Sequence, residues 1–264
     1  MLVLAVAVLT LAPLRAGAET AREILDRAHA LDNSTRHWTD RSQHLTLLIV
    51  GAGGDERRRE LTVMTKRYPG DETKALSSFL EPSEVKGTAF LQWGHKNAPD
   101  EQWLYLPDLR RTRRITSDLS SESFMGTDFS YQDLGILSEA PSWTEEEAPS
   151  TLVGEETVDG HACYVIALRP KQEDMAYSRI QVWLDKEALV PRRMDFFDKD
   201  DAAVKSLLFE GIENIGAFPS ARVLEMRQLK TGSKTRLEAS DVKFDTGLSD
   251  DLFTQRYLER GAPQ

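Results

Sequence analysis

The chain has 264 residues, with 33 lysines and arginines against 43 aspartates and glutamates, a formal net charge of −10, and 40% hydrophobic residues. This composition is that of a folded globular protein and excludes a disordered or collagen-like chain. The negative charge argues against a general nucleic-acid-binding protein, because such proteins present a basic face to phosphates. A single cysteine, Cys163, excludes an intramolecular disulfide.

The first eighteen residues have the pattern of a secretory signal peptide. Residues 1–14 form an apolar run that is shorter than the ~20 residues of a membrane-spanning helix. Ala16, Gly17 and Ala18 follow as a small-residue cleavage site. We therefore expect a signal peptide over residues 1–18, cleaved after Ala18, and one exported domain over residues 19–264. The export site is most simply the periplasm, and an uncleaved anchor is the alternative.

Apolar periodicity predicts one helix followed by many strands. Residues 20–31 place Ala21, Ile24, Leu25 and Ala28 on one helical stripe. From residue 45 onward the period is two, which is typical of β-strands. Strands are expected over residues 45–50, 57–67, 73–80, 88–93, 101–106, 111–115, 151–157, 161–169, 178–184, 190–197, 203–212, 221–229 and 234–244. Short strands without long helices between them predict an antiparallel sheet, sandwich or barrel, not a parallel α/β fold.

One segment interrupts the strand pattern, Phe124–Ala140, and it contains the sequence FMGTDFSYQDLGIL over residues 124–137. Asp128 is the expected N-cap of a short helix that runs through Tyr131 and Leu134. Gly126 is the expected hinge if the segment moves.

Catalytic and metal-binding patterns are missing from the sequence. None of the five histidines stands in an HExxH or similar pair, and neither GxSxG nor a phosphate-binding loop occurs. We expect no metal, no cofactor and no enzymatic activity. A carboxylate pair of the glycosidase kind stays open, because it leaves no local spacing pattern. Cys163, within a strand, is expected to be a buried, unreactive thiol.

The aromatic residues of the central half point to a strand that is covered on both faces. Trp103 and Tyr105 share one face of residues 101–106, while Leu104 and Leu106 share the other. Two interpretations are open. One is ordinary core packing, and the other is an apolar cavity inside a curved sheet that the Phe124–Leu137 segment closes as a lid.

A cluster of four arginines within five residues, 110–114, is unusual in an acidic chain. On a strand, Arg111 and Arg113 point to one face, and Arg110 and Arg114 to the other. An inward pair could donate to lid carbonyls or bind an acidic headgroup. The equally weighted alternative is a solvated edge strand, where charges prevent aggregation.

Three stretches carry a resemblance to a known family. They are FLEP with KGTAFL in residues 79–91, WLYLP with RRTRRI in residues 103–115, and SFMGTDFSYQDL in residues 123–134. With these, the chain resembles the outer-membrane lipoprotein-sorting proteins, a LolA-like bacterial family. The resemblance implies a mainly β (α+β) fold, an unclosed antiparallel β-barrel covered by short helices around an apolar cavity. It also implies a monomeric periplasmic carrier of lipid or lipoprotein acyl chains in a Gram-negative bacterium, working with an RND-type (MMPL-like) transporter.

The site expected from these observations is an apolar cavity with its lid. Its expected lining residues are Trp93, Trp103, Tyr105, Phe124, Met125, Phe129, Tyr131 and Leu134, while Arg111 and Arg113 are expected to bind a headgroup or lock the lid. Two other functions stay open. One is an accessory subunit of an RND pump whose cavity is filled by its own side chains. The other is an exported hydrolase with a polar pocket and a strongly shifted carboxylate or histidine.

Overall fold

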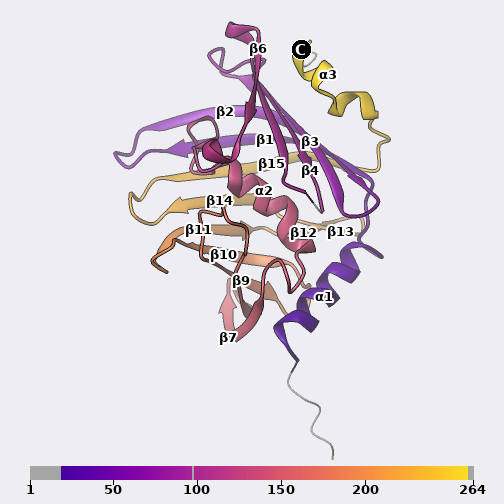
Figure 1. Cartoon of the computed structure of the whole chain (residues 1–264), viewed down its shortest axis with the longest axis vertical. Helices are drawn as coiled ribbons and strands as arrows, with labels where there is room; N and C mark the ends of the chain where they lie inside the picture. Colours follow the sequence, from indigo (N-terminus) through magenta and orange to yellow (C-terminus); the bar gives the residue numbers. More distant parts are fainter. Residues whose placement is uncertain (1–18, 97, 261–264) are drawn as a thin grey trace, which may run out of the picture.

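The structure is a computed structural model that describes residues 19–96 and 98–260 (Figure 1). The expected signal peptide lies outside these residues. Within them, one antiparallel sheet of 13 strands has the order β6-β5-β4-β3-β2-β1-β15-β14-β11-β10-β9-β8-β7. Strands β6 and β7 are therefore its two edges, and the sheet is not closed. This confirms the expected unclosed, mainly β architecture.

The bounds of the strands in the large sheet lie within two residues of those predicted, except that β1 begins at Asp40 and not at residue 45. They are β1 (Asp40–Val50), β2 (Glu56–Tyr68), β3 (Glu72–Glu81), β4 (Ala89–Gly94), β5 (Glu101–Leu106), β6 (Arg111–Ile115), β7 (Ser150–Val158), β8 (His161–Leu168), β9 (Arg179–Asp185), β10 (Pro191–Phe197), β11 (Ala203–Glu210), β14 (Val223–Gln228) and β15 (Lys234–Phe244). Two short strands, β12 (Glu213–Ile215) and β13 (Phe218–Ser220), form a separate hairpin that the sequence pattern did not predict.

Strand β15 joins the two halves of the sheet. It pairs with β1, with Leu47 opposite Leu237, while β1 pairs on its other side with β2, with Leu45 opposite Leu61. The last strand of the chain thus lies beside the first, and one continuous face runs from β6 to β7 (Figure 1).

Within residues 19–96 and 98–260, three α-helices accompany the sheet. Helix α1 (Ala21–Asp32) confirms the predicted N-terminal helix and begins with a capping box between Thr20 and Glu23. Helix α2 (Tyr131–Glu139) crosses in front of the sheet, and α3 (Gln255–Glu259) lies at the end near β6 (Figure 1). Short 3-10 turns are η1 (Pro107–Leu109), η2 (Ser117–Leu119), η3 (Phe124–Gly126), η4 (Ala140–Ser142) and η5 (Asp250–Phe253). Among the described residues, no helix has the length and apolarity to cross a membrane.

The main core lies between one face of the sheet and the segments that cover it. That face contributes alternate residues from nearly every strand, and α1 adds Ala21 and Ile24. The Phe124–Leu137 segment supplies the remaining cover, with Phe124, Phe129, Tyr131 and Ile136 all buried. We call this the inner face of the sheet. Because apolar burial is the main favourable term in folding, these covering segments are integral to stability.

Candidate functional site

The lid, residues Phe124–Leu137, begins as a tight loop and continues as helix α2. The loop is closed by hydrogen bonds from Phe124 N to Phe129 O (2.7 Å) and from Ser123 Oγ to Thr127 O (2.6 Å). Met125 and Gly126 have positive φ angles of 51° and 71°. Glycine adopts this conformation freely, whereas a methionine is held in it against its preference. The expected hinge at Gly126 therefore coincides with an unusual backbone, and its motion stays a prediction.

Ser130, not Asp128, caps helix α2. The Ser130 Oγ accepts from Asp133 N (3.1 Å), and Asp133 Oδ2 accepts from Ser130 N (2.7 Å). The predicted cap at Asp128 was wrong because that side chain has stronger partners on the sheet. Its carboxylate accepts from Ser233 Oγ (2.6 Å) and Thr235 Oγ1 (2.7 Å), which tie the lid loop to β15.

Aromatic side chains of the lid fill the inner face of the sheet. The Phe124 ring lies 5.1 Å from that of Phe90, 6.0 Å from that of Phe79 and 5.6 Å from that of Tyr131, between ring centroids. Such pairs add about 0.5–1.5 kcal/mol each to the burial of the rings. Phe129 is 3% exposed in the same core. The side chains of the lid therefore pack directly against the inner face of the sheet.

Two arginines of β2 hold the start of the lid. Arg59 Nη1 donates to Met125 O, and Arg57 Nη2 donates to Gly126 O at 3.4 Å. Burial, together with the nearby Arg57, lowers the pKa of Arg59. Arg58, between them, faces the other way and pairs with Glu60 at 2.8 Å. Arginine side chains therefore do donate to lid carbonyls, but these arginines are Arg57 and Arg59, not the predicted Arg111 and Arg113.

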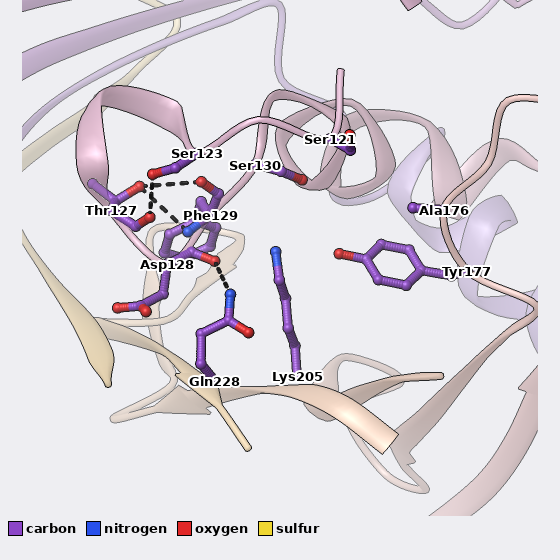
Figure 2. A pocket seen from close by; sticks show the side chains of 10 residues that line it. All are labelled: Ser121, Ser123, Thr127, Asp128, Phe129, Ser130, Ala176, Tyr177, Lys205 and Gln228. Atoms are coloured by element: carbon purple, nitrogen blue, oxygen red, sulfur yellow. Dashed lines mark hydrogen bonds between the residues drawn. The ribbon is translucent and has the colours of Figure 1, made fainter. Parts of the chain in front are cut away.

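A polar recess of about 200 Å³ lies where the lid meets the sheet (Figure 2). In Figure 2, Lys205 of β11 and Gln228 of β14 rise from the sheet toward the lid, with Tyr177 to one side. Lys205 Nζ lies 2.6 Å from Asp133 Oδ2, and Tyr177 OH donates to Asp133 Oδ1 at 2.6 Å. Burial and the adjacent carboxylate raise the pKa of Tyr177. This cluster fixes the first turn of α2 to the sheet.

A second carboxyl cluster lies at the other end of α2. Gln92 Nε2 donates to Asp100 Oδ2 (2.7 Å), and His95 N donates to Asp100 Oδ1 (3.2 Å). Burial and the neighbouring Glu139 carboxylate raise the pKa of Asp100 to about 8. A shifted carboxyl group is what the hydrolase hypothesis requires. Asp100 is, however, not among the residues that line the recess.

The structure divides the expected lining residues between the two faces of the sheet. Phe124, Met125, Phe129, Tyr131 and Leu134 belong to the core under the lid. Trp93, Trp103 and Tyr105 lie on the outer face, where they pack with residues of the C-terminal segment such as Phe253 and Leu258. Trp93 Nε1 donates to Phe253 O (2.9 Å), which anchors that segment. The expectation that all eight residues line one cavity is corrected accordingly.

Arg111 and Arg113 lie on the edge strand β6 and are exposed. Their register partners are Leu106 and Leu104, so they are on the same face as the lid. Among the described residues, neither makes an ion pair or a hydrogen bond to the lid. These arginines therefore lie on an edge strand, as one of the two interpretations expected, and the arginines that donate to lid carbonyls are Arg57 and Arg59.

The described part of the chain holds no group of three His, Cys, Asp or Glu side chains suited to a metal ion. Cys163 is buried, as predicted, and burial raises the pKa of its thiol. Sequence reasoning missed Lys205, Tyr177, Arg57 and Arg59. Only Asp133 had a local signal, since it stands three residues after Ser130 in a capping-box pattern.

Comparisons with known proteins agree with this geometry. A family model described as an uncharacterized protein matches residues 71–260. A solved outer membrane lipoprotein-sorting protein domain from Vibrio parahaemolyticus is 29% identical, with a TM-score of 0.80 over 89% of this chain and 100% of that one. A DUF1329 family protein from Desulfovibrio piger is 30% identical, with a TM-score of 0.81 over 89% of this chain and 97% of that one.

This chain belongs to the DUF1329 family, and its fold is that of the LolA-like outer membrane lipoprotein-sorting proteins. A LolA superfamily protein from Nitrosomonas europaea shares the fold, with a TM-score of 0.68 and 20% identity over 91% of this chain and 100% of that one. No curated protein matches the sequence. The family resemblance seen in the three sequence stretches is confirmed.

Proposed function

We propose that the protein is a carrier that holds the acyl chains of a lipid or lipoprotein between the lid and the inner face of the sheet. The observation that supports this most directly is the packing of Phe124 and Phe129 into the inner face. These rings occupy apolar space that an acyl chain can take over when the lid swings away. The polar contacts of the lid lie at its margins, at Arg57, Arg59 and Asp133.

The energies are compatible with such an exchange. Exposing a buried aromatic or aliphatic side chain costs about 1.5–3 kcal/mol. The free-energy cost of opening the lid, which exposes several such side chains, is therefore several kcal/mol. Burial of about ten CH₂ groups of an acyl chain gains roughly 8 kcal/mol. Burial of an acyl chain therefore offsets the free-energy cost of opening the lid. Release follows when the acyl chain moves to another apolar environment that buries it equally well.

We place this carrier in the periplasm, as a monomer that comprises residues 19–264 after cleavage of the signal peptide. Relatives in outer membrane lipoprotein sorting support this compartment. A partnership with an RND-type (MMPL-like) transporter rests on the family resemblance, and co-purification with the membrane fraction tests it. Non-enzymatic function is part of the same proposal, because a carrier needs no reacting groups.

A second candidate is supported by the same packing. If the lid never opens, the protein is an accessory subunit of an RND pump with its cavity filled by its own side chains. The two candidates differ in whether the inner face ever accepts a ligand.

Native mass spectrometry of the protein, purified from the periplasm without detergent, separates them. A retained lipid or acylated protein, identified after solvent extraction, supports the carrier. A protein that is empty, and that also fails to bind a fluorescent fatty acid added in solution, excludes the carrier and favours the accessory subunit.

A further inference from the structure

The turn between β5 and β6, together with the start of β6, carries a dense cluster of arginines. Leu109, Arg110, Arg111, Arg113 and Arg114, which we call the β6 tip, are all exposed, with Leu109 67% exposed. Asp108 is the one carboxylate in residues 107–114, against four guanidinium groups. The whole chain has a formal net charge of −10, so this concentration of positive charge is local.

The arginines of the tip are largely free to bind an external anion. Arg114 pairs with Glu101 at 3.2 Å. Among residues 19–96 and 98–260, Arg110, Arg111 and Arg113 make no ion pair. The adjacent β3–β4 loop contributes both Glu84 and Lys86, and so does not neutralise the tip. Three guanidinium groups therefore remain fully available to oxygen ligands, which they bind in bidentate fashion.

The tip also projects from the body of the protein. Strand β6 and the turn before it lie at the upper end of the longest axis in Figure 1. Arg110 adopts a left-handed conformation (φ 45°) at the end of η1, which turns the chain back into β6. Helix α3 packs beside β6, and Arg256 and Glu259 of this helix and Arg260 at its C-cap are exposed.

We propose that the β6 tip docks the protein onto an anionic bilayer surface, with its arginines on lipid phosphates and Leu109 inserted among the headgroups. The charge is complementary to such a surface, and an exposed leucine at the apex is the usual form of a shallow apolar anchor. A protein partner that adds a strand to the β6 edge is less favoured, because closely spaced charges on an edge strand oppose strand addition. The proposal goes beyond the carrier function and does not depend on it.

Vesicle sedimentation tests the proposal with the protein lacking residues 1–18. Vesicles of one third phosphatidylglycerol and two thirds phosphatidylcholine should retain the protein, pure phosphatidylcholine should not, and added salt should weaken retention. Replacement of Arg110, Arg111 and Arg113 by glutamine should reduce the partition coefficient on the order of 100-fold, since each arginine contributes roughly fivefold. Leu109→Asn should reduce it less, and at all salt concentrations alike.

The matched control replaces three exposed lysines elsewhere, Lys171, Lys199 and Lys230, by glutamine. It changes the net charge equally and should leave retention unchanged. Equal loss in this control would overturn the proposal in favour of a general charge effect. Absence of binding by the unsubstituted protein would also overturn it and leave an acidic protein as the occupant. Binding of a fluorescent fatty acid without vesicles reports separately on the carrier function.

Discussion

Lys205 Nζ lies 2.6 Å from Asp133 Oδ2, in a buried ion pair that joins strand β11 to the first turn of the lid helix. Asp133 also accepts bonds from Tyr177 OH and Ser130 N, so its charge is fully engaged. A buried pair of this kind adds little net stability, but loss of one partner leaves an uncompensated charge. We therefore expect this ion pair, which we call the latch, to hold the lid helix against the sheet.

Lys205→Met should destabilise the closed lid by about 3–5 kcal/mol, because Asp133 remains buried without its cation. Denaturant unfolding and hydrogen exchange of residues 124–139 measure the effect. The double variant Lys205→Met/Asp133→Asn should recover part of the loss. Arg222→Gln breaks the exposed pair with Glu213 and should cost less than about 1 kcal/mol. A single Lys205 variant as stable as this control would contradict the latch.

Phe124→Asp should weaken binding of a fluorescent lipid while the sheet stays folded. The aspartate cannot enter the apolar core, and the lid then fails to close over the ligand. Fluorescence titration gives the affinity, and far-UV circular dichroism checks the fold. Unchanged affinity in a folded variant would count against the lid.

Arg59→Gln should make the amides of residues 124–127 exchange on the order of tenfold faster, because the charged hydrogen bond to Met125 O is lost. Arg58→Gln is the matched control on the same strand, since Arg58 pairs with Glu60 on the other face. Equal exchange in both variants would show that the contact of Arg59 with the lid carries no stability.

Asp100 makes stability fall as pH rises. Its folded pKa of about 8 lies above the ordinary value of 3.8, so the folded state keeps a proton that the unfolded state has lost between these values. The contribution is fully present below about pH 4 and is lost as pH rises through about 8. Asp100→Asn should remove this dependence of stability on pH and should stabilise the protein at high pH by roughly a few kcal/mol. Unfolding curves at several pH values measure it, and an unaltered slope would refute the assignment.

Trp103→Ala should lower stability by about 3–5 kcal/mol without changing lipid affinity in the folded protein. Trp103 is buried on the outer face, 4.8 Å from Trp93 between ring centroids, and does not touch the lid core. Phe129→Ala, on the inner face, should lower both stability and affinity. A fall in lipid affinity for Trp103→Ala as large as that for Phe129→Ala would show that Trp103 contributes to ligand binding after all.

The strands were predictable because their signal is local. Alternation of apolar residues located β5 and β6 at their observed bounds, and it placed Trp103 with Tyr105 on one face and Leu104 with Leu106 on the other. The break in alternation at residue 124 located the lid. The helix cap was misplaced because Asp128 and Ser130 both suit that position, and only contacts with β15 distinguish them.

Local patterns were thus sufficient for helix α1 and the strands of the large sheet and, with the family resemblance, for its unclosed form, but they left the role of the β6 arginines open. Only the tertiary structure decided which face of that sheet meets the lid, because alternation of apolar residues separates two faces without identifying which one the lid covers. The choice depends on residues 248–258, which return from the end of the chain to cover Trp93 and Trp103. It also decided the lid contacts, since Lys205 meets Asp133 across 72 residues and Arg59 meets Met125 across 66. Residues so far apart in the sequence become neighbours only when the chain folds, and local sequence patterns do not report such contacts.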